Sequence, residues 1–206
     1  LVAKPQMLAD TGYILSHRFS ANGRSIYLGG RNRLYRYDLA KGLIVTLSDD
    51  VIYYVTDICD TPDGDYVDYL EGLPRKSGFE VHLCPRDPSK TPITLLSGLG
   101  LGNPSFLPTC IDIDSSGAEM AISARTRSVP NETEFYSIIR VDLRTGRPVQ
   151  KTVSLHHIHA VRYIGGTRTL AVYGEVHQRS LRNFFGFLEA GSEVIVGQHE
   201  VDSMIN

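Results

Sequence analysis

Several features that would assign this 206-residue chain to a common functional class are missing. No apolar run approaches the roughly 18–20 residues of a membrane-spanning helix, so we expect no membrane association. The net charge of −2 lacks the basic surplus typical of nucleic-acid binders, so nucleic acid is not an expected partner. No basic stretch followed by an apolar core and a cleavage site is present, so we expect no signal peptide and a cytoplasmic location.

Cysteine is also scarce, and its spacing excludes two further classes. The three cysteines, Cys59, Cys84 and Cys110, are widely separated and form no Cys-x-x-Cys pair. Neither a structural zinc site nor a disulfide framework is therefore indicated. Each cysteine lies in or beside a strand-like run, where a free thiol behaves as a small hydrophobic group. This usage favours a reducing compartment.

What the sequence does contain is a repeat. A short turn recurs at 20–23, 61–64 and 114–117, with a weaker copy at 164–167. Asn-Gly and Asp-Gly pairs tolerate positive φ angles where a strand reverses, so each copy predicts a hairpin. The copies follow one another at steps of about 40–55 residues, the range of four-stranded propeller blades.

A second signature follows each turn. Residues 33–39 read Arg-Leu-Tyr-Arg-Tyr-Asp-Leu and lead to Gly42, and residues 138–143 read Ile-Ile-Arg-Val-Asp-Leu and lead to Gly146. Related runs cover 79–83 and 184–188. Their alternation is the period-2 pattern of a half-buried strand, and the aspartate and glycine mark the turn into the next strand.

Each repeat unit thus predicts four strands, and no segment shows a capped helical period. We expect strands at 13–19, 25–29, 33–38 and 43–48; at 52–59, 65–70, 78–84 and 92–96; at 106–113, 118–124, 135–142 and 148–153; and at 155–163, 169–175, 183–189 and 193–199. The predicted fold is all-β, a β-propeller of four consecutive antiparallel blades at about 13–50, 51–98, 104–154 and 155–199. Regularly spaced short strands also suit a β-sandwich, but sandwich strands are rarely self-similar.

Residues 2–8 read as one strand more than four blades require. Because ring closure removes exposed sheet edges, a surplus strand indicates blades outside this sequence or supplied by another chain. The alternative is that this strand closes the fourth blade and that the tail after Gly197 has another role. We therefore treat 1–206 as a single propeller domain or a segment of one. Its predicted partners are a protein, or another propeller chain, at the blade edges.

The strand ending Tyr-Asp-Leu or Val-Asp-Leu before a glycine turn resembles TolB-like and WD40-like propeller repeats. More distantly, His17-Arg18 before the Gly23 turn, the stretch 141–146 and the run 172–175 resemble the propeller of oligogalacturonate lyases. That family cleaves pectic oligomers by β-elimination with a manganese ion, a general base and an arginine. The resemblance implies an oligosaccharide substrate, with His177 and Arg182 near it. The family's metal ligands lie in later blades that have no counterpart here.

The candidate binding residues are His17, Arg18, His157, His159, His177 and Arg182. In a strand, His157 and His159 point to one face, a workable metal arrangement if a third ligand comes from elsewhere. The alternative is that these histidines satisfy backbone carbonyls or line a wet channel. The loop 175–182 is polar and follows a strand, a place where rigid scaffolds often bind ligands.

The sequence therefore predicts a propeller that works as a binding or interaction module through its blade-end loops. The alternative is a carbohydrate-active lyase with a divalent metal such as manganese. No catalytic residue, metal ligand or cofactor is assigned from the sequence.

Overall fold

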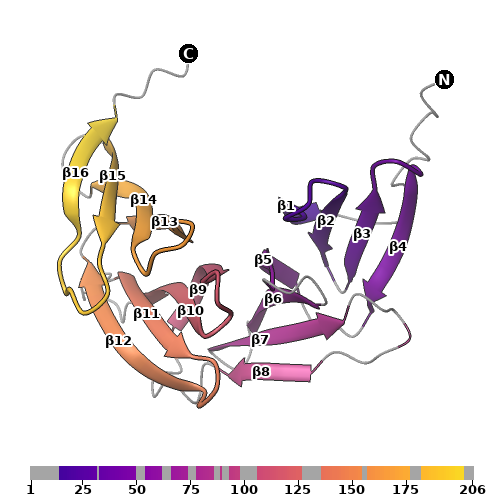
Figure 1. The fold of residues 1–206 in the computed structure, drawn as a ribbon, viewed down its shortest axis with the longest axis horizontal. Helices are drawn as coiled ribbons and strands as arrows, with labels where there is room; N and C mark the ends of the chain where they lie inside the picture. The colour runs from indigo at the N-terminus through magenta and orange to yellow at the C-terminus, as the bar shows by residue number, and fades with distance from the viewer. Residues whose placement is uncertain are drawn as a thin grey trace. The chain divides into compact units, whose positions relative to one another are not determined.

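The structure is a computed structural model that describes residues 14–31, 33–49, 54–61, 66–73, 78–85, 89, 93–97, 106–126, 136–154, 157–176 and 182–201. These residues form four antiparallel sheets of four strands each, which we call blades one to four (Figure 1). Blade one contains β1 (Ile14–Phe19), β2 (Ser25–Gly30), β3 (Leu34–Asp38) and β4 (Leu43–Ser48). Blade two contains β5 (Tyr54–Asp60), β6 (Tyr66–Leu73), β7 (Gly78–Pro85) and β8 (Ile93–Ser97). Blade three contains β9 (Phe106–Ile113), β10 (Glu119–Thr126), β11 (Tyr136–Asp142) and β12 (Arg147–Ser154). Blade four contains β13 (His157–Tyr163), β14 (Leu170–Val176), β15 (Arg182–Leu188) and β16 (Val196–Val201).

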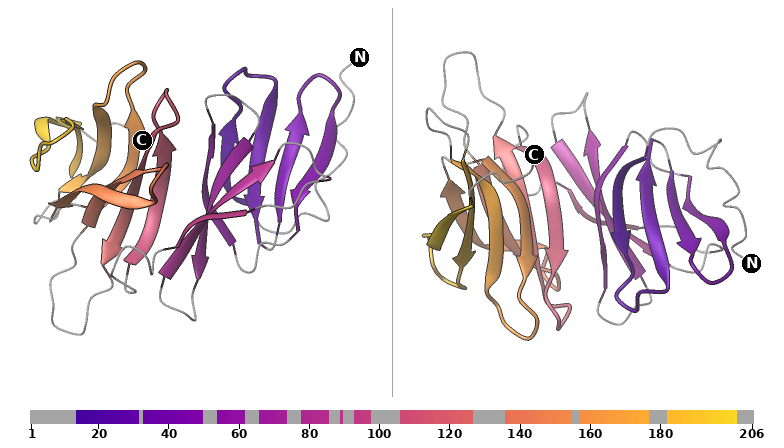
Figure 2. Two further views of the ribbon diagram at one scale, coloured as in Figure 1. Left: turned by 60° about the horizontal axis from the view of Figure 1, so that its bottom comes forward. Right: turned by 90° about the horizontal axis from the view of Figure 1, so that it is seen from above.

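Within each blade the strands pair in chain order, so every sheet is a simple up-and-down meander (Figure 2). The predicted all-β class and the four-strand repeat are confirmed. The largest boundary differences are three residues: β6 ends at Leu73 instead of residue 70, and the last strand begins at Val196 instead of residue 193. Gly191 has a φ of +80°, and the Ser192 hydroxyl bonds both the N–H and the C=O of Val194, so the preceding turn continues for several residues.

The aspartate of the repeated motif has a direct structural role. Gly42 N–H donates to the Asp38 carbonyl at 2.9 Å, and Gly146 N–H donates to the Asp142 carbonyl at 2.8 Å. The Asp38 carboxylate also accepts the N–H groups of Ala40 and Lys41, while Asp142 accepts that of Thr145. An aspartate at the strand end therefore satisfies the turn's backbone donors, which explains why the motif recurs at this point of two blades.

The chain divides into two compact units, Leu1–Ser97 and Gly98–Asn206. The first unit contains blades one and two, the second contains blades three and four, and each is described by itself. The prediction of a single propeller domain over 1–206 stays a prediction, and the strand expected at 2–8 lies outside the described residues. Within the part of the chain that is described, no helix has the length and apolar character needed to cross a bilayer.

Each unit buries an apolar cluster between its two blades. The cluster of the first unit comprises Tyr27, Leu34, Leu47, Val55, Ile58 and Cys84. The cluster of the second unit comprises Cys110, Ala121, Tyr136, Ile138, Ile158, Val161, Leu170, Val172, Phe184, Leu188 and Ile195. All three cysteines are buried and none of them forms a disulfide, as expected for thiols packed as small apolar groups.

The expectation of a half-buried strand is wrong for β11. Its residues from Tyr136 to Val141 are all buried, so neither face of this strand is open to solvent. Tyr136 and Ile138 belong to the apolar cluster shared with blade four. Arg140 lies on the same face and also reaches blade four, through the carbonyls of Arg168 and Leu188. A strand covered on both sides cannot show the solvent-facing half of the period-2 pattern.

A buried polar network joins blades three and four. The Arg140 guanidinium donates to Glu119 at 2.8 Å, to the Arg168 carbonyl at 2.8 Å and to the Leu188 carbonyl at 2.9 Å. Glu119 also accepts the hydroxyl of Tyr163 at 2.7 Å and an N–H of the Arg168 side chain. Glu119 is 5% exposed and Arg140 is 1% exposed, so the buried charge of Arg140 is compensated by Glu119, which also pairs with Arg168.

This network makes the second unit sensitive to acid. Burial raises the pKa of Glu119, but the hydrogen bonds from Tyr163, Arg140 and Arg168 outweigh it and hold the pKa below its ordinary value of 4.5. A carboxylate with a lowered pKa stabilises the folded state above its unfolded pKa, and that stabilisation is lost as the pH falls through its folded pKa. Glu119→Gln should therefore have a lower free energy of unfolding than the native chain at neutral pH, and the difference between the two should decrease below pH 4.5. Urea unfolding at a series of pH values measures this difference. A difference that does not change with pH would contradict the expectation.

Candidate functional site

His157 and His159 begin β13, and the structure confirms that they share a face. Their ring centroids lie 4.3 Å apart. Glu175, near the end of the neighbouring strand β14, lies opposite His157 in the register. Its carboxylate approaches His159 Nε2 at 3.2 Å and His157 Nδ1 at 3.9 Å. The third group that the sequence left unnamed is therefore Glu175.

Aromatic rings flank the two imidazoles. Tyr136, from β11 of blade three, stacks on His157 with ring centroids 4.5 Å apart. Tyr173, from β14, lies 5.6 Å from His159. Tyr136 is buried, whereas the side chains of His157, His159 and Glu175 are each about one-third exposed. The group is held by packing yet open to solvent. We call His157, His159 and Glu175 the histidine cluster.

The other predicted residues do not join this cluster in the described part of the chain. His17 is exposed on β1 in the first unit. Arg18 donates to the Ile58 carbonyl at 3.2 Å and so links blade one to blade two. Arg182 is the first residue of β15, and its side chain is outside the description. His177 lies outside the described residues, so its place in a substrate site stays a prediction.

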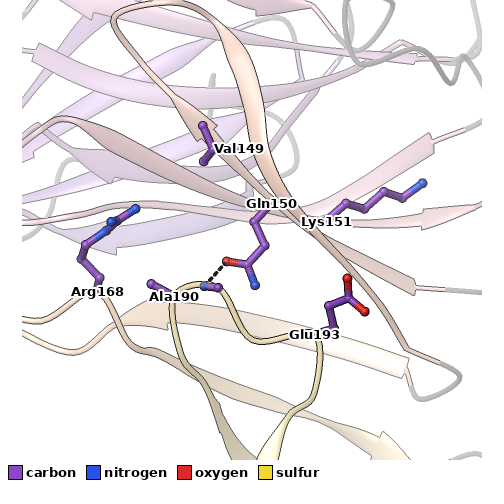
Figure 3. Close-up of a pocket in the computed structure, with 7 residues that line it drawn as sticks. Val149, Gln150, Lys151, Arg168, Ala190 and Glu193 are labelled. Atoms are coloured by element: carbon purple, nitrogen blue, oxygen red, sulfur yellow. Dashed lines mark hydrogen bonds between the residues drawn. The ribbon is translucent and has the colours of Figure 1, made fainter.

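A pocket of about 560 Å³ lies at the ends of the blade-four strands that are opposite to the histidine cluster. It is lined by Val149, Gln150, Lys151, Arg168, Ala190, Gly191 and Glu193. The first three belong to β12 of blade three, Arg168 belongs to the β13–β14 turn, and the rest belong to the β15–β16 turn (Figure 3). Val149 is skipped in the β11–β12 register, where a bulge separates the pairs of Arg140 and Val141. Bulges often occur where a strand re-aims a side chain.

Gln150 holds the wall of this pocket together. Its side-chain oxygen accepts the Gly191 N–H at 2.9 Å (Figure 3). Its amide N–H donates to the Ser192 carbonyl. A side chain of blade three thus fixes the β15–β16 turn of blade four. The Arg168 guanidinium donates to Glu119, and this contact holds the Arg168 side chain in place. The same contact raises the pKa of Arg168 above its ordinary value. The pocket therefore has a preformed frame.

Exposed valines occur on β12, on the β15–β16 turn and at the start of β16, and Val149 among them lines the pocket. Val149, Val153, Val194 and Val196 are exposed by 55%, 55%, 64% and 48%. Charge is contributed by Lys151, Arg168 and Glu193, two cations and one carboxylate. Apolar side chains around a few charged groups are typical of surfaces that recognise a ligand or partner. Sequence reasoning missed this pocket because its walls come from two blades.

No family model matches the chain, and no curated protein matches its sequence. Its structure is similar to a chain of a nidogen/laminin complex, at a TM-score of 0.67 and 12% identity over 93% of this chain and 65% of that one. It is similar to the tricorn protease at a TM-score of 0.62 and 8% identity over 91% and 22%. It is also similar to Kuenenia stuttgartiensis hydrazine synthase, at a TM-score of 0.56 and 14% identity over 84% and 50%.

The chain thus spans less than two-thirds of the length of each of these three structures. Identities between 8% and 14% support a conclusion about the fold and nothing finer. The observed sheets nevertheless agree closely with the repeat in the sequence, because each described blade is a four-stranded meander in chain order. This chain is an all-β protein built of β-propeller blades.

Proposed function

We propose that this chain is a protein-binding module and that the pocket between β12 and the β15–β16 turn receives a segment of the partner. The observation that supports this most directly is the pocket itself, about 560 Å³ framed by Gln150. A volume of roughly 300–1,000 Å³ with a few placed charged groups is what a ligand-sized group requires. Val149, which is 55% exposed, provides apolar contact in the pocket.

The likeness to a nidogen/laminin complex adds a weaker argument. A chain of the same fold takes part there in a complex between two proteins. Propeller blades provide a rigid base on which turns can vary, and binding residues are concentrated on such turns. The pocket is built in this way, because four of its seven lining residues lie on two turns of blade four.

Ala190→Trp tests the proposal by filling the pocket. Ala190 is exposed, so the indole adds no buried strain, yet it occupies the space that the partner needs. Ala40→Trp is the matched control, since Ala40 is an exposed alanine in the β3–β4 turn of blade one. Proteins recovered by affinity purification on the native chain should bind at least about tenfold more weakly to Ala190→Trp, a loss of roughly 1.4 kcal/mol. Equal loss in both variants, or in neither, would contradict the proposal.

The lyase activity implied by the resemblance is a separate candidate. It requires His177 and Arg182 near a pectic oligomer. Incubating the chain with such oligomers, with and without added manganese, and following the ultraviolet absorbance of unsaturated products tests it directly. Formation of unsaturated products would show that the chain is an enzyme, and that result would replace the proposal of a binding module.

A further inference from the structure

The histidine cluster is a group of three metal-ligand side chains on two adjacent strands. One nitrogen each of His157 and His159 and one oxygen of Glu175 all lie within 4.8 Å of one another. Ligand atoms at about 2.0–2.1 Å from a tetrahedral Zn²⁺ ion are separated by roughly 3.4 Å. The observed separation of His159 Nε2 from the Glu175 carboxylate is 3.2 Å, and that of His157 Nδ1 is 3.9 Å. Both separations from the carboxylate are thus within about 0.5 Å of the value in such a site.

A bulge in the backbone of β13 positions these side chains. Ile158 pairs with Gly174 and Ala160 pairs with Tyr173, so His159 is the extra residue of β13. The first strand of every other blade, β1, β5 or β9, has a bulge at the same point, with Leu15, Thr56 and Thr109 as the skipped residues. The bulge is thus a feature of the fold, while the imidazole at this position occurs in blade four alone.

The other blades also show that the fold does not require the remaining two ligands. The pair that corresponds to His157 and Glu175 is Tyr54 and Gly72 in blade two. In blade three the pair is Leu107 and Arg125. The same backbone is therefore built with apolar, hydroxyl, glycine or cationic residues at these positions. The needs of folding therefore do not explain why two imidazoles and a carboxylate meet at these positions in blade four.

Packing restricts how far the imidazoles can turn. The stacked ring of Tyr136 limits His157, and Tyr173 lies beside His159. Gly174 allows the two strands to approach, because a Cβ there would lie 2.1 Å from the His157 carbonyl oxygen. Ligands held in place before the ion arrives lose little freedom when they bind it.

We propose that His157, His159 and Glu175 bind one divalent transition-metal ion of the zinc class. Two nitrogen donors and one carboxylate suit Zn²⁺ and disfavour Mg²⁺ and Ca²⁺, which take oxygen ligands. Three protein ligands leave at least one coordination position for water or for an atom of a ligand. The site opens to solvent, so the ion can exchange. It lies at the opposite end of β13 from the pocket, and it does not depend on the proposed partner.

Competition with a chromophoric chelator tests the site on the full chain after treatment with EDTA. The native chain should bind Zn²⁺ through this site, and His159→Ala and Glu175→Gln should each weaken that binding. Because removing a residue that only supports a ligand weakens binding roughly 10–100-fold, removing a ligand should exceed about 100-fold. His17→Ala is the matched control, because His17 is an exposed histidine on β1, the first strand of blade one. This variant should bind Zn²⁺ as the native chain does.

A second readout separates ligation from folding. Co²⁺ added to the native chain should give visible absorption bands that are absent from His159→Ala and Glu175→Gln, while the circular dichroism and urea midpoints of all variants stay near native. Binding that is equal in the native chain and His159→Ala overturns the proposal. So does a loss in His17→Ala as large as that in His159→Ala. An affinity unchanged by Glu175→Gln removes the carboxylate from the ligand set and overturns the three-ligand site.

Discussion

Arg140→Met is expected to lower the free energy of unfolding of the Gly98–Asn206 unit by about 3–5 kcal/mol, because it breaks a buried ion pair and leaves two backbone carbonyls without their donor. Arg140 is 1% exposed and makes three hydrogen bonds. Methionine keeps much of the side-chain volume but none of the donors. Glu119 would keep only Tyr163 and Arg168, and two backbone carbonyls of blade four would each lose a donor.

Urea unfolding followed by circular dichroism measures the loss, and hydrogen exchange of peptides from β11 and β15 locates it. Arg147→Met is the matched control, because Arg147 is an exposed arginine of the adjacent strand β12. Surface substitutions of this kind usually change stability by less than about 0.5 kcal/mol. If the two variants unfold at the same urea concentration, the polar network does not join the blades as described.

The strands and turns of this chain could be predicted because their signals are local. The glycines of the predicted turns have φ angles of +66° at Gly23, +72° at Gly117 and +73° at Gly166. Positive φ angles of this kind are readily adopted by glycine, so the residue type itself reveals the turn. The aspartate of the repeated motif is equally local, since Asp38 bonds atoms two and three residues away.

The network around Arg140 could not be predicted because its partners are remote in the sequence. Arg140 lies 21 residues from Glu119 and 48 from Leu188. In the sequence it stands as one cation in a strand-like run, and period-2 reasoning gives such a residue no preference for a buried partner. Only the packing of blade four against β11 covers it. The pocket was missed for the same reason, because Gln150 and Gly191 belong to different blades.

The role of Glu175 was hidden by the bulge in β13. Counting back from the pair of Tyr163 and Leu170 with an unbroken register places Glu175 opposite Ile158, on the face away from the histidines. The extra residue shifts the pairing by one, so that Glu175 lies opposite His157. A one-residue shift moves a side chain to the other face of a strand. The prediction that His157 and His159 share a face was therefore correct, while the approach of Glu175 to them required the structure.

Gly174→Ala is expected to disturb the histidine cluster by pushing β13 away from β14. Its Cβ would meet the His157 carbonyl oxygen at 2.1 Å and the Phe184 ring at 2.8 Å and 3.0 Å. The carbonyl belongs to the backbone of β13, so the strand itself must move away from β14. Overpacking of this kind typically lowers the unfolding free energy by about 1–3 kcal/mol. Because His157 provides that carbonyl, the spacing of the histidine cluster should change as well.

Gly165→Ala is the matched control for that substitution. Gly165 lies in the β13–β14 turn of the same blade, and a Cβ there would meet nothing within 4 Å. Replacing a glycine that has space and no positive φ stabilises a protein by about 0.4–1 kcal/mol, since the unfolded chain loses freedom. Urea unfolding should therefore separate the two variants in opposite directions, and the Zn²⁺ affinity should fall only in Gly174→Ala. A Gly174→Ala protein as stable as the native chain would show that β13 and β14 approach less closely than this register requires.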